Sequence, residues 1–180
     1  CKDAMFDIAE QDTTQFDLDH YTTLADNGLY LDAQAYCLAQ WGPMAGWQRA
    51  DQIKIAVRLL SNLGRDRDAD ALILRGWRRF KNDADLCLKV VFYQLNRFGP
   101  ILAQRFYQQH LPLLQQLNNA YTDLALVQIC FYADQKDFVA ANELLEQIRP
   151  QANDYPWFHR IALMLLQDQQ LYPNAAELAQ

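Results

Sequence analysis

The side chains best suited to catalysis or metal binding are few and widely spaced in this chain. Its histidines are His20, His110 and His159, and none has a second histidine or a cysteine at zinc-ligand spacing. Ser61 is the single serine and lies outside any G-x-S-x-G motif, which argues against a serine hydrolase. No glycine-rich phosphate-binding motif occurs either. We therefore expect a protein that is not an enzyme and that uses no cofactor and no metal ion.

Two pairs of acidic residues are the next candidates for chemistry. Asp17 and Asp19 form one pair, and Asp66 and Asp68 form the other. Carboxylates are favoured in the first turn of a helix, where they meet the positive end of the helix dipole. This structural role fits both pairs better than general acid–base catalysis does.

The cysteines predict buried, unreactive thiols. Cys37, Cys87 and Cys130 stand far apart inside apolar helical patterns, and no pair has the C-x-x-C spacing of a metal or redox site. Free thiols in a core suit a reducing compartment, so we expect a cytoplasmic protein.

Cys1 leaves alternatives open. It can be an arbitrary fragment boundary, or the lipid-modified first residue of a mature bacterial lipoprotein, which would place the protein in the cell envelope or periplasm. An N-terminal catalytic nucleophile is a third interpretation, but that chemistry is similar to a family built on layered sheets, which an all-helical chain does not supply.

The charge of the chain argues against a nucleic-acid partner, and its hydropathy argues against a transmembrane segment. The chain has a net charge of −6 and a pI near 4.9, whereas nucleic-acid binding needs clustered Lys and Arg. No apolar run reaches the roughly 18 residues of a transmembrane segment. The oligomeric state does not follow from the sequence.

Composition and periodicity predict an all-α protein. Gly and Pro number six each, Leu, Ala and Gln abound, and no β-branched residues alternate over a useful length. Turn signals recur about every 35 residues, at Gly28, Gly64, Gly99, near Lys136 and near Gln170. Each separates two apolar-periodic stretches of helical length. Helical hairpins of this size bury their apolar faces by stacking.

The prediction is one domain over residues 1–180, an α-solenoid forming a right-handed superhelix of about five hairpins. The expected hairpins cover residues 14–40, 47–80, 83–113, 120–149 and 156–180. Pro112 is expected to kink or end its helix, Pro150 to end the next one, and Tyr172-Pro173 to open a last helix.

The turn regions resemble tetratricopeptide repeats. That family places a Tyr or Phe two residues after the turn glycine, and an alanine three residues further on. Gly28, Tyr30 and Ala33 match this spacing. The remaining matches are Phe138, Ala141 and Pro150 with Tyr132 upstream, Gly64 with Ala69, and Tyr172 with Ala175. The chain departs from the family where Tyr21, Phe92 and Ile129 replace the small residue of the first helix, and the early Trp is missing.

The resemblance implies a concave groove lined by the first helix of each hairpin, which binds an extended peptide or a partner helix. The groove positions it implies are Asp51, Lys54, Arg58, Lys89, Tyr93 and Asn96. Lys, Arg and Asn side chains that converge there can hold acidic groups of a partner through charge-assisted hydrogen bonds. A basic cluster lies in the same region: Arg65, Arg67, Arg75, Arg78, Arg79 and Lys81. The alternative is that these cations form a solvated face.

The expected function is therefore a scaffold or adaptor for protein–protein interaction. Two alternatives stay open: an accessory module of a larger enzyme or regulator, and a lipid-anchored envelope assembly factor that starts at Cys1.

Overall fold

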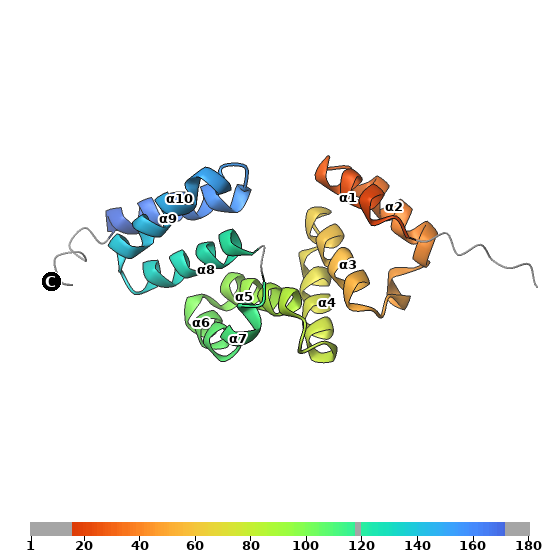
Figure 1. Cartoon of the computed structure of the whole chain (residues 1–180), viewed down its shortest axis with the longest axis horizontal. Coiled ribbons are helices and arrows are strands. Elements are labelled where there is room, and N and C mark those ends of the chain that lie inside the picture. Colours follow the sequence, from red (N-terminus) through yellow and green to blue (C-terminus); the bar gives the residue numbers. More distant parts are fainter. Residues whose placement is uncertain (1–15, 118–119, 172–180) are drawn as a thin grey trace, which may run out of the picture. The chain divides into compact units, whose positions relative to one another are not determined.

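The computed structural model describes residues 16–117 and 120–171, and every regular element in these ranges is a helix (Figure 1). The elements are α1 Leu18–Asp26, α2 Tyr30–Trp41, the 3₁₀ turn η1 Met44–Gly46, α3 Ala50–Asn62, α4 Asp66–Arg79, α5 Ala84–Phe98, α6 Pro100–Gln109, α7 Leu111–Leu114, α8 Tyr121–Asp134, α9 Phe138–Ala152 and α10 Pro156–Leu171. The all-α prediction is confirmed. Cys1 and the expected last helix at residues 172–180 lie outside the described residues.

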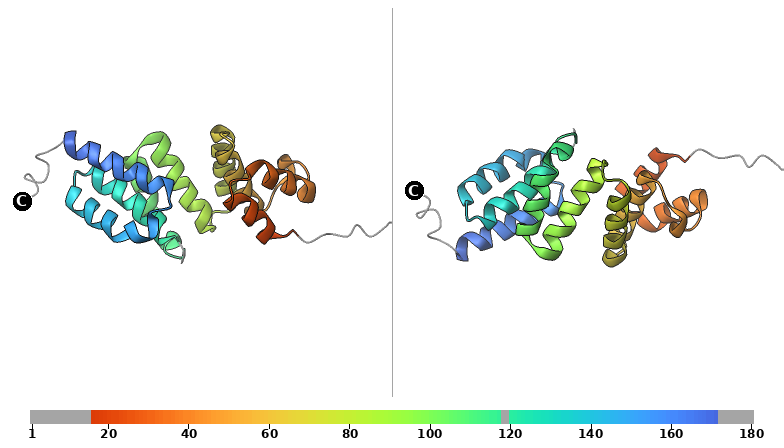
Figure 2. Two further views of the ribbon diagram at one scale, coloured as in Figure 1. Left: turned by 90° about the horizontal axis from the view of Figure 1, so that it is seen from above. Right: turned by 90° about the horizontal axis from the view of Figure 1, so that it is seen from below.

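The chain divides into two compact units, Cys1–Leu72 and Ile73–Gln180. In the first unit α2 packs against α1 and α3. In the second unit α5 packs against α6, α8 against α9, and α10 against both α8 and α9. Figure 2 shows the cyan-to-blue helices of the second unit side by side from two opposite directions. The single-domain interpretation stays a prediction.

One packing relation recurs within the units, as a helical repeat requires. The second helix of a hairpin contacts the first helix of the next hairpin in the pairs α2–α3 and α6–α8, and α9 contacts α10, the helix that follows its hairpin. Because each hairpin offers its apolar face to the next, the core is shared between neighbours rather than closed within one hairpin.

A buried alanine marks the fourth residue of each second helix. Ala33 in α2, Ala103 in α6 and Ala141 in α9 are completely buried, and Ala69 in α4 is 1% exposed. A methyl side chain at a helix crossing lets the two backbones approach closely while the surrounding larger side chains fill the space. The resemblance to tetratricopeptide repeats included Ala33, Ala69 and Ala141, and the structure adds Ala103 to the series.

Three of the turns between paired helices use the same backbone geometry. Gly28, Gly64 and Lys136 have φ values of 75°, 74° and 63°. In each case the next residue donates its N–H to a carbonyl five residues back, from Leu29 to Leu24, from Arg65 to Leu60 and from Asp137 to Tyr132, at 2.8–2.9 Å. This is the Schellman arrangement that closes a helix with a left-handed residue.

The turn between α5 and α6 is built differently. Gly99 combines a φ of 83° with a ψ of −177°, and Pro100 follows directly as the first residue of α6. Glycine is nearly alone in tolerating this backbone conformation. Proline at the first helical position loses no hydrogen bond.

Two prolines have different effects on their helices. The helix that contains Pro112 is interrupted at His110, and Pro112 lies in the short α7, in line with the expected kink. The expectation that Pro150 ends its helix is wrong, because α9 continues to Ala152. Pro150 lies inside the last turn of α9, where it removes one hydrogen bond to the carbonyl four residues back, and the helix continues for two more residues.

We expect Gly64→Ala to lower the free energy of unfolding by about 1–2 kcal/mol. No atom lies within 4 Å of a Cβ built at Gly64, so the cost comes from its left-handed backbone alone. Gly46→Ala is the matched control, because Gly46 is in the same unit, has equal space and lacks a positive φ. Equal stability of the two variants in urea unfolding would contradict this account of the turn.

Candidate partner-binding pocket

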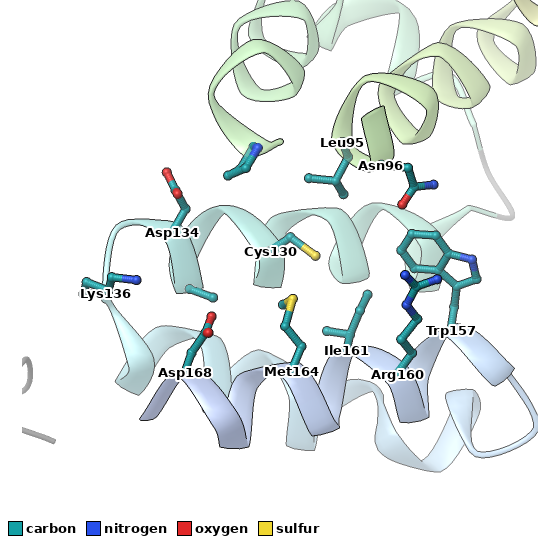
Figure 3. A pocket seen from close by; sticks show the side chains of 12 residues that line it. Leu95, Asn96, Cys130, Asp134, Lys136, Trp157, Arg160, Ile161, Met164 and Asp168 are labelled. Atoms are coloured by element: carbon teal, nitrogen blue, oxygen red, sulfur yellow. The ribbon is translucent and has the colours of Figure 1, made fainter. Parts of the chain in front are cut away.

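A cavity of about 440 Å³ lies in the second unit, among α5, α8 and α10. Helices α5 and α8 are the first helices of their hairpins, and α10 is the helix that follows the α8–α9 hairpin. The volume falls within the range of about 300–1,000 Å³ that is typical of ligand pockets. The residues that line it are Leu95, Asn96, Pro100, Cys130, Ala133, Asp134, Lys136, Trp157, Arg160, Ile161, Met164 and Asp168 (Figure 3).

Helix α10 supplies the longest wall of the pocket. Trp157, Arg160, Ile161, Met164 and Asp168 follow one another at intervals of one, three or four residues. This spacing places them on one face of a helix. Ile161 is buried, whereas Arg160 is exposed, so the wall passes from the core to solvent along its width.

The last turns of α8 form the floor. Cys130 and Ala133 are buried there, and Asp134 is the exposed final residue of the helix. Lys136 enters the lining from the turn that follows. Its left-handed backbone belongs to the repeated turn described above, so the turn that closes α8 also supplies a cation to the pocket.

The C-terminal part of α5 forms the opposite wall. Leu95 and Asn96 line the pocket, and Pro100 at the start of α6 completes this side. Phe92 of α5 meets Trp157 of α10 edge to face, with ring centroids 5.1 Å apart. This aromatic contact joins the two walls and holds Trp157 in place.

Charged groups occupy both ends of the pocket. Figure 3 shows Arg160 beside Trp157 and Asn96 at one end, and Asp134, Asp168 and Lys136 at the other, with Met164 and Cys130 between them. The guanidinium carbon of Arg160 is 5.9 Å from the centroid of the Trp157 ring, within range of a cation–π interaction. The pocket therefore combines an apolar middle with ends of different charge.

The thiol of Cys130 is held in its protonated form. Burial, with a smaller contribution from the nearby carboxylate of Asp168, raises its pKa to about 12. A thiol is a nucleophile only as the thiolate, so Cys130 contributes apolar surface to the floor rather than a reactive group. Cys37 and Cys87 are likewise buried free thiols with raised pKa values, as the sequence predicted.

Three of the residues implied for a groove lie on α3 in the first unit. Asp51, Lys54 and Arg58 share one face of this helix at intervals of three and four residues. Asp51 pairs with Arg49 at 2.8 Å. Arg58 pairs with Asp26 of α1 at 2.7 Å. Asp51 and Arg58 are therefore already engaged in ion pairs within the protein.

Arg58 also lies beside an unusual tyrosine. Burial raises the pKa of Tyr21 to about 12, while the positive charge of Arg58 acts in the opposite direction. The Tyr21 hydroxyl is buried and has no hydrogen-bond partner. Tyr21 occupies a position where the tetratricopeptide family has a small residue, and its ring fills the core of this unit.

The other three implied residues lie on α5 in the second unit. Lys89 and Tyr93 are half-buried and Asn96 is exposed, all on one face of the helix. Lys89 lies close to Asp123 of α8: burial raises the pKa of Asp123 and the charge of Lys89 lowers it. Of the six implied residues, Asn96 is the one that lines the pocket. Their binding role stays a prediction.

None of the pocket residues on α8 and α10 was predicted from the sequence. The predicted groove positions lie on α3 and α5, the first helices of the second and third hairpins, and the series was not extended to the later helices. The same helical face continued along α10 would have found Trp157, Arg160, Met164 and Asp168. Lys136 carried no such signal, because it comes from a turn.

Residues 16–117 and 120–171 contain no group of three or more His, Cys, Asp or Glu side chains placed to hold a metal ion. None of their helices combines the length and apolar character needed to cross a membrane.

No family model, curated protein or solved structure matches the chain. The resemblance to tetratricopeptide repeats therefore rests on the residues of the turns and helices themselves, and the pocket has to be interpreted from its own geometry.

We expect the stability of the protein to fall at alkaline pH, in part through Cys130. An unfolded thiol has a pKa of about 8.5, so above this pH the unfolded state releases a proton that the folded state retains. Stability is fully present below that value and decreases as the pH rises towards about 12, the pKa of folded Cys130. One such group contributes a slope of up to about 1.4 kcal/mol per pH unit.

Urea unfolding of Cys130→Ala between pH 7 and pH 11 tests this expectation. The variant should be less stable at neutral pH, because it loses core volume, but its stability should decrease less steeply with pH. Val127→Ala is the control: Val127 is completely buried and does not titrate, so this variant should keep the slope of the parent protein. An unchanged slope in Cys130→Ala would refute the assignment.

Proposed function

We propose that this protein is an interaction module that holds a short segment of a partner protein in the pocket among α5, α8 and α10. The observation that carries the proposal is the origin of this pocket: its walls and floor come from α5 and α8, the first helices of two successive hairpins, and from α10, the next helix in the chain. In tetratricopeptide repeats, which the turns and helices resemble, the first helices line the groove that binds a partner.

The chemistry of the lining supports binding rather than catalysis. Its middle is apolar, with Leu95, Ile161 and Met164 beside the protonated thiol of Cys130. Polar groups stand at the ends, where they can orient an occupant without reacting with it. A pocket of this size takes a few residues of a peptide, and small interfaces of this kind are typical of transient complexes.

Contacts between the helices that line the pocket support a site that exists before the partner binds. Phe92 and Trp157 fix the distance between α5 and α10, and α10 packs on α8 and α9. A site that exists before the partner arrives costs less ordering on binding than one that has to form.

We expect Met164→Trp to abolish most peptide binding, because an indole at this position fills the apolar middle of the pocket. Selection of random displayed peptides on the parent protein should enrich specific sequences. These should bind Met164→Trp at least about tenfold more weakly, which corresponds to about 1.4 kcal/mol.

Leu163→Trp is the matched control, because Leu163 is the neighbouring residue on α10, is 58% exposed and does not line the pocket. This variant should bind the selected peptides like the parent protein. Failure to enrich any sequence, or equal losses in both variants at equal thermal stability, would overturn the proposed function.

A further inference from the structure

The ends of the pocket differ in charge, and this difference restricts what the pocket can hold. Arg160 is the charged group at the end formed by Trp157 and Asn96. At the other end two carboxylates, Asp134 and Asp168, stand near one ammonium group, that of Lys136. The first end therefore favours an anionic group, and the second has an excess of negative charge that favours a cationic group.

The distance between the two ends can be derived from α10. Arg160 and Asp168 are eight residues apart on this helix, which corresponds to about 12 Å at a rise of 1.5 Å per residue. An extended peptide advances about 3.3 Å per residue, so about four residues span the same length.

The apolar middle determines what lies between the charges. Ile161 and Met164 of α10 face Cys130 of α8 across this part of the pocket, and Ala133 of α8 also lines it. None of these side chains forms strong hydrogen bonds, so a polar group of the occupant would lose its hydration there without compensation. An apolar side chain gains by burial at the same place.

We propose that the occupant is an extended peptide segment with an acidic and a basic side chain about four residues apart and an apolar side chain between them, the acidic group at Arg160 and the basic group at Asp134 and Asp168. This inference rests on the proposed function and specifies the chemistry of the partner. A uniformly acidic segment would bring like charge to Asp134 and Asp168, and a uniformly basic one would do so at Arg160.

Lys136 limits how many basic groups the occupant can place at this end of the pocket. Its ammonium group is on the same side as the two carboxylates and offsets part of their charge. A single cation of the partner is therefore enough to balance this end, whereas a cluster of cations would meet repulsion from Lys136.

Synthetic peptides labelled with a fluorophore test the proposal by fluorescence anisotropy. The first peptide carries an aspartate and a lysine about four residues apart with a leucine between them. The second replaces both charged residues with Asn and Gln, and a third reverses the order of the first sequence. The parent protein should bind the first or the reversed peptide at least about tenfold more tightly than the neutral one, since either chain direction satisfies both ends.

Charge reversal at Arg160 provides the decisive comparison. Arg160→Glu should weaken binding of the charged peptide about tenfold or more, and it should bind a peptide whose aspartate is replaced by lysine better than the parent protein does. Arg105→Glu is the matched control: Arg105 is exposed on α6 in the same unit and does not line the pocket. It should leave both affinities unchanged, and circular dichroism should show the same fold for both variants.

Three results would overturn the inference: no binding of either charged peptide, equal binding of the neutral peptide, or equal effects of Arg160→Glu and Arg105→Glu. The proposed function has its own readout. If the neutral peptide binds the parent protein as tightly as the charged one but does not bind Met164→Trp, the pocket is a peptide site and the proposed charge pattern is wrong. If selection on displayed peptides also enriches nothing, both proposals fail.

Discussion

A single helical hairpin leaves one apolar face uncovered, and the need to cover that face organises this protein. The hairpins meet this need by placing their second helix against the helix that follows, in α2–α3, α6–α8 and α9–α10. The buried alanine at the fourth residue of each second helix keeps the paired backbones close. A larger side chain there would push the helices apart and expose the core that they share. The turn signals therefore recur about every 35 residues because each hairpin has to pack against the next one.

The same constraint explains where a binding site can form. The first helices are buried more than the second ones: α3, α5 and α8 contain six, five and seven buried residues, whereas α2, α6 and α9 contain two, two and five. In the second unit α5, α8 and α10 nevertheless border a common cavity. Its lining combines the core residues Cys130, Ala133 and Ile161 with exposed residues such as Asp134 and Arg160, so the exposed residues are the ones that can change at little cost to the packing.

The sequence was sufficient for the parts of the structure that depend on local rules. Gly28, Gly64 and Gly99 marked their turns because a positive φ favours glycine, and Asp83 accepts the N–H of Leu86 as the cap of α5. The pocket was not predictable in the same way. Its lining comes from three helices and one turn, and which faces converge depends on the packing between hairpins. Asn96 was predicted because it follows the family pattern. Arg160 and Asp168 were not predicted, because that pattern was not applied to the helix that carries them. The prediction for Pro150 was wrong because a proline removes one backbone hydrogen bond without necessarily ending the helix, and α9 continues to Ala152.

The turn at Lys136 shows where the demands of fold and site diverge. In two other hairpins the equivalent left-handed position is glycine, and at 136 the chain carries a lysine at a cost of about 1–2 kcal/mol in backbone strain. The same residue lines the pocket. Selection for thermal stability alone would favour glycine at this position, whereas selection for binding would retain the ammonium group. Variation at this one site in natural or evolved populations would therefore record which of the two pressures acted on the protein.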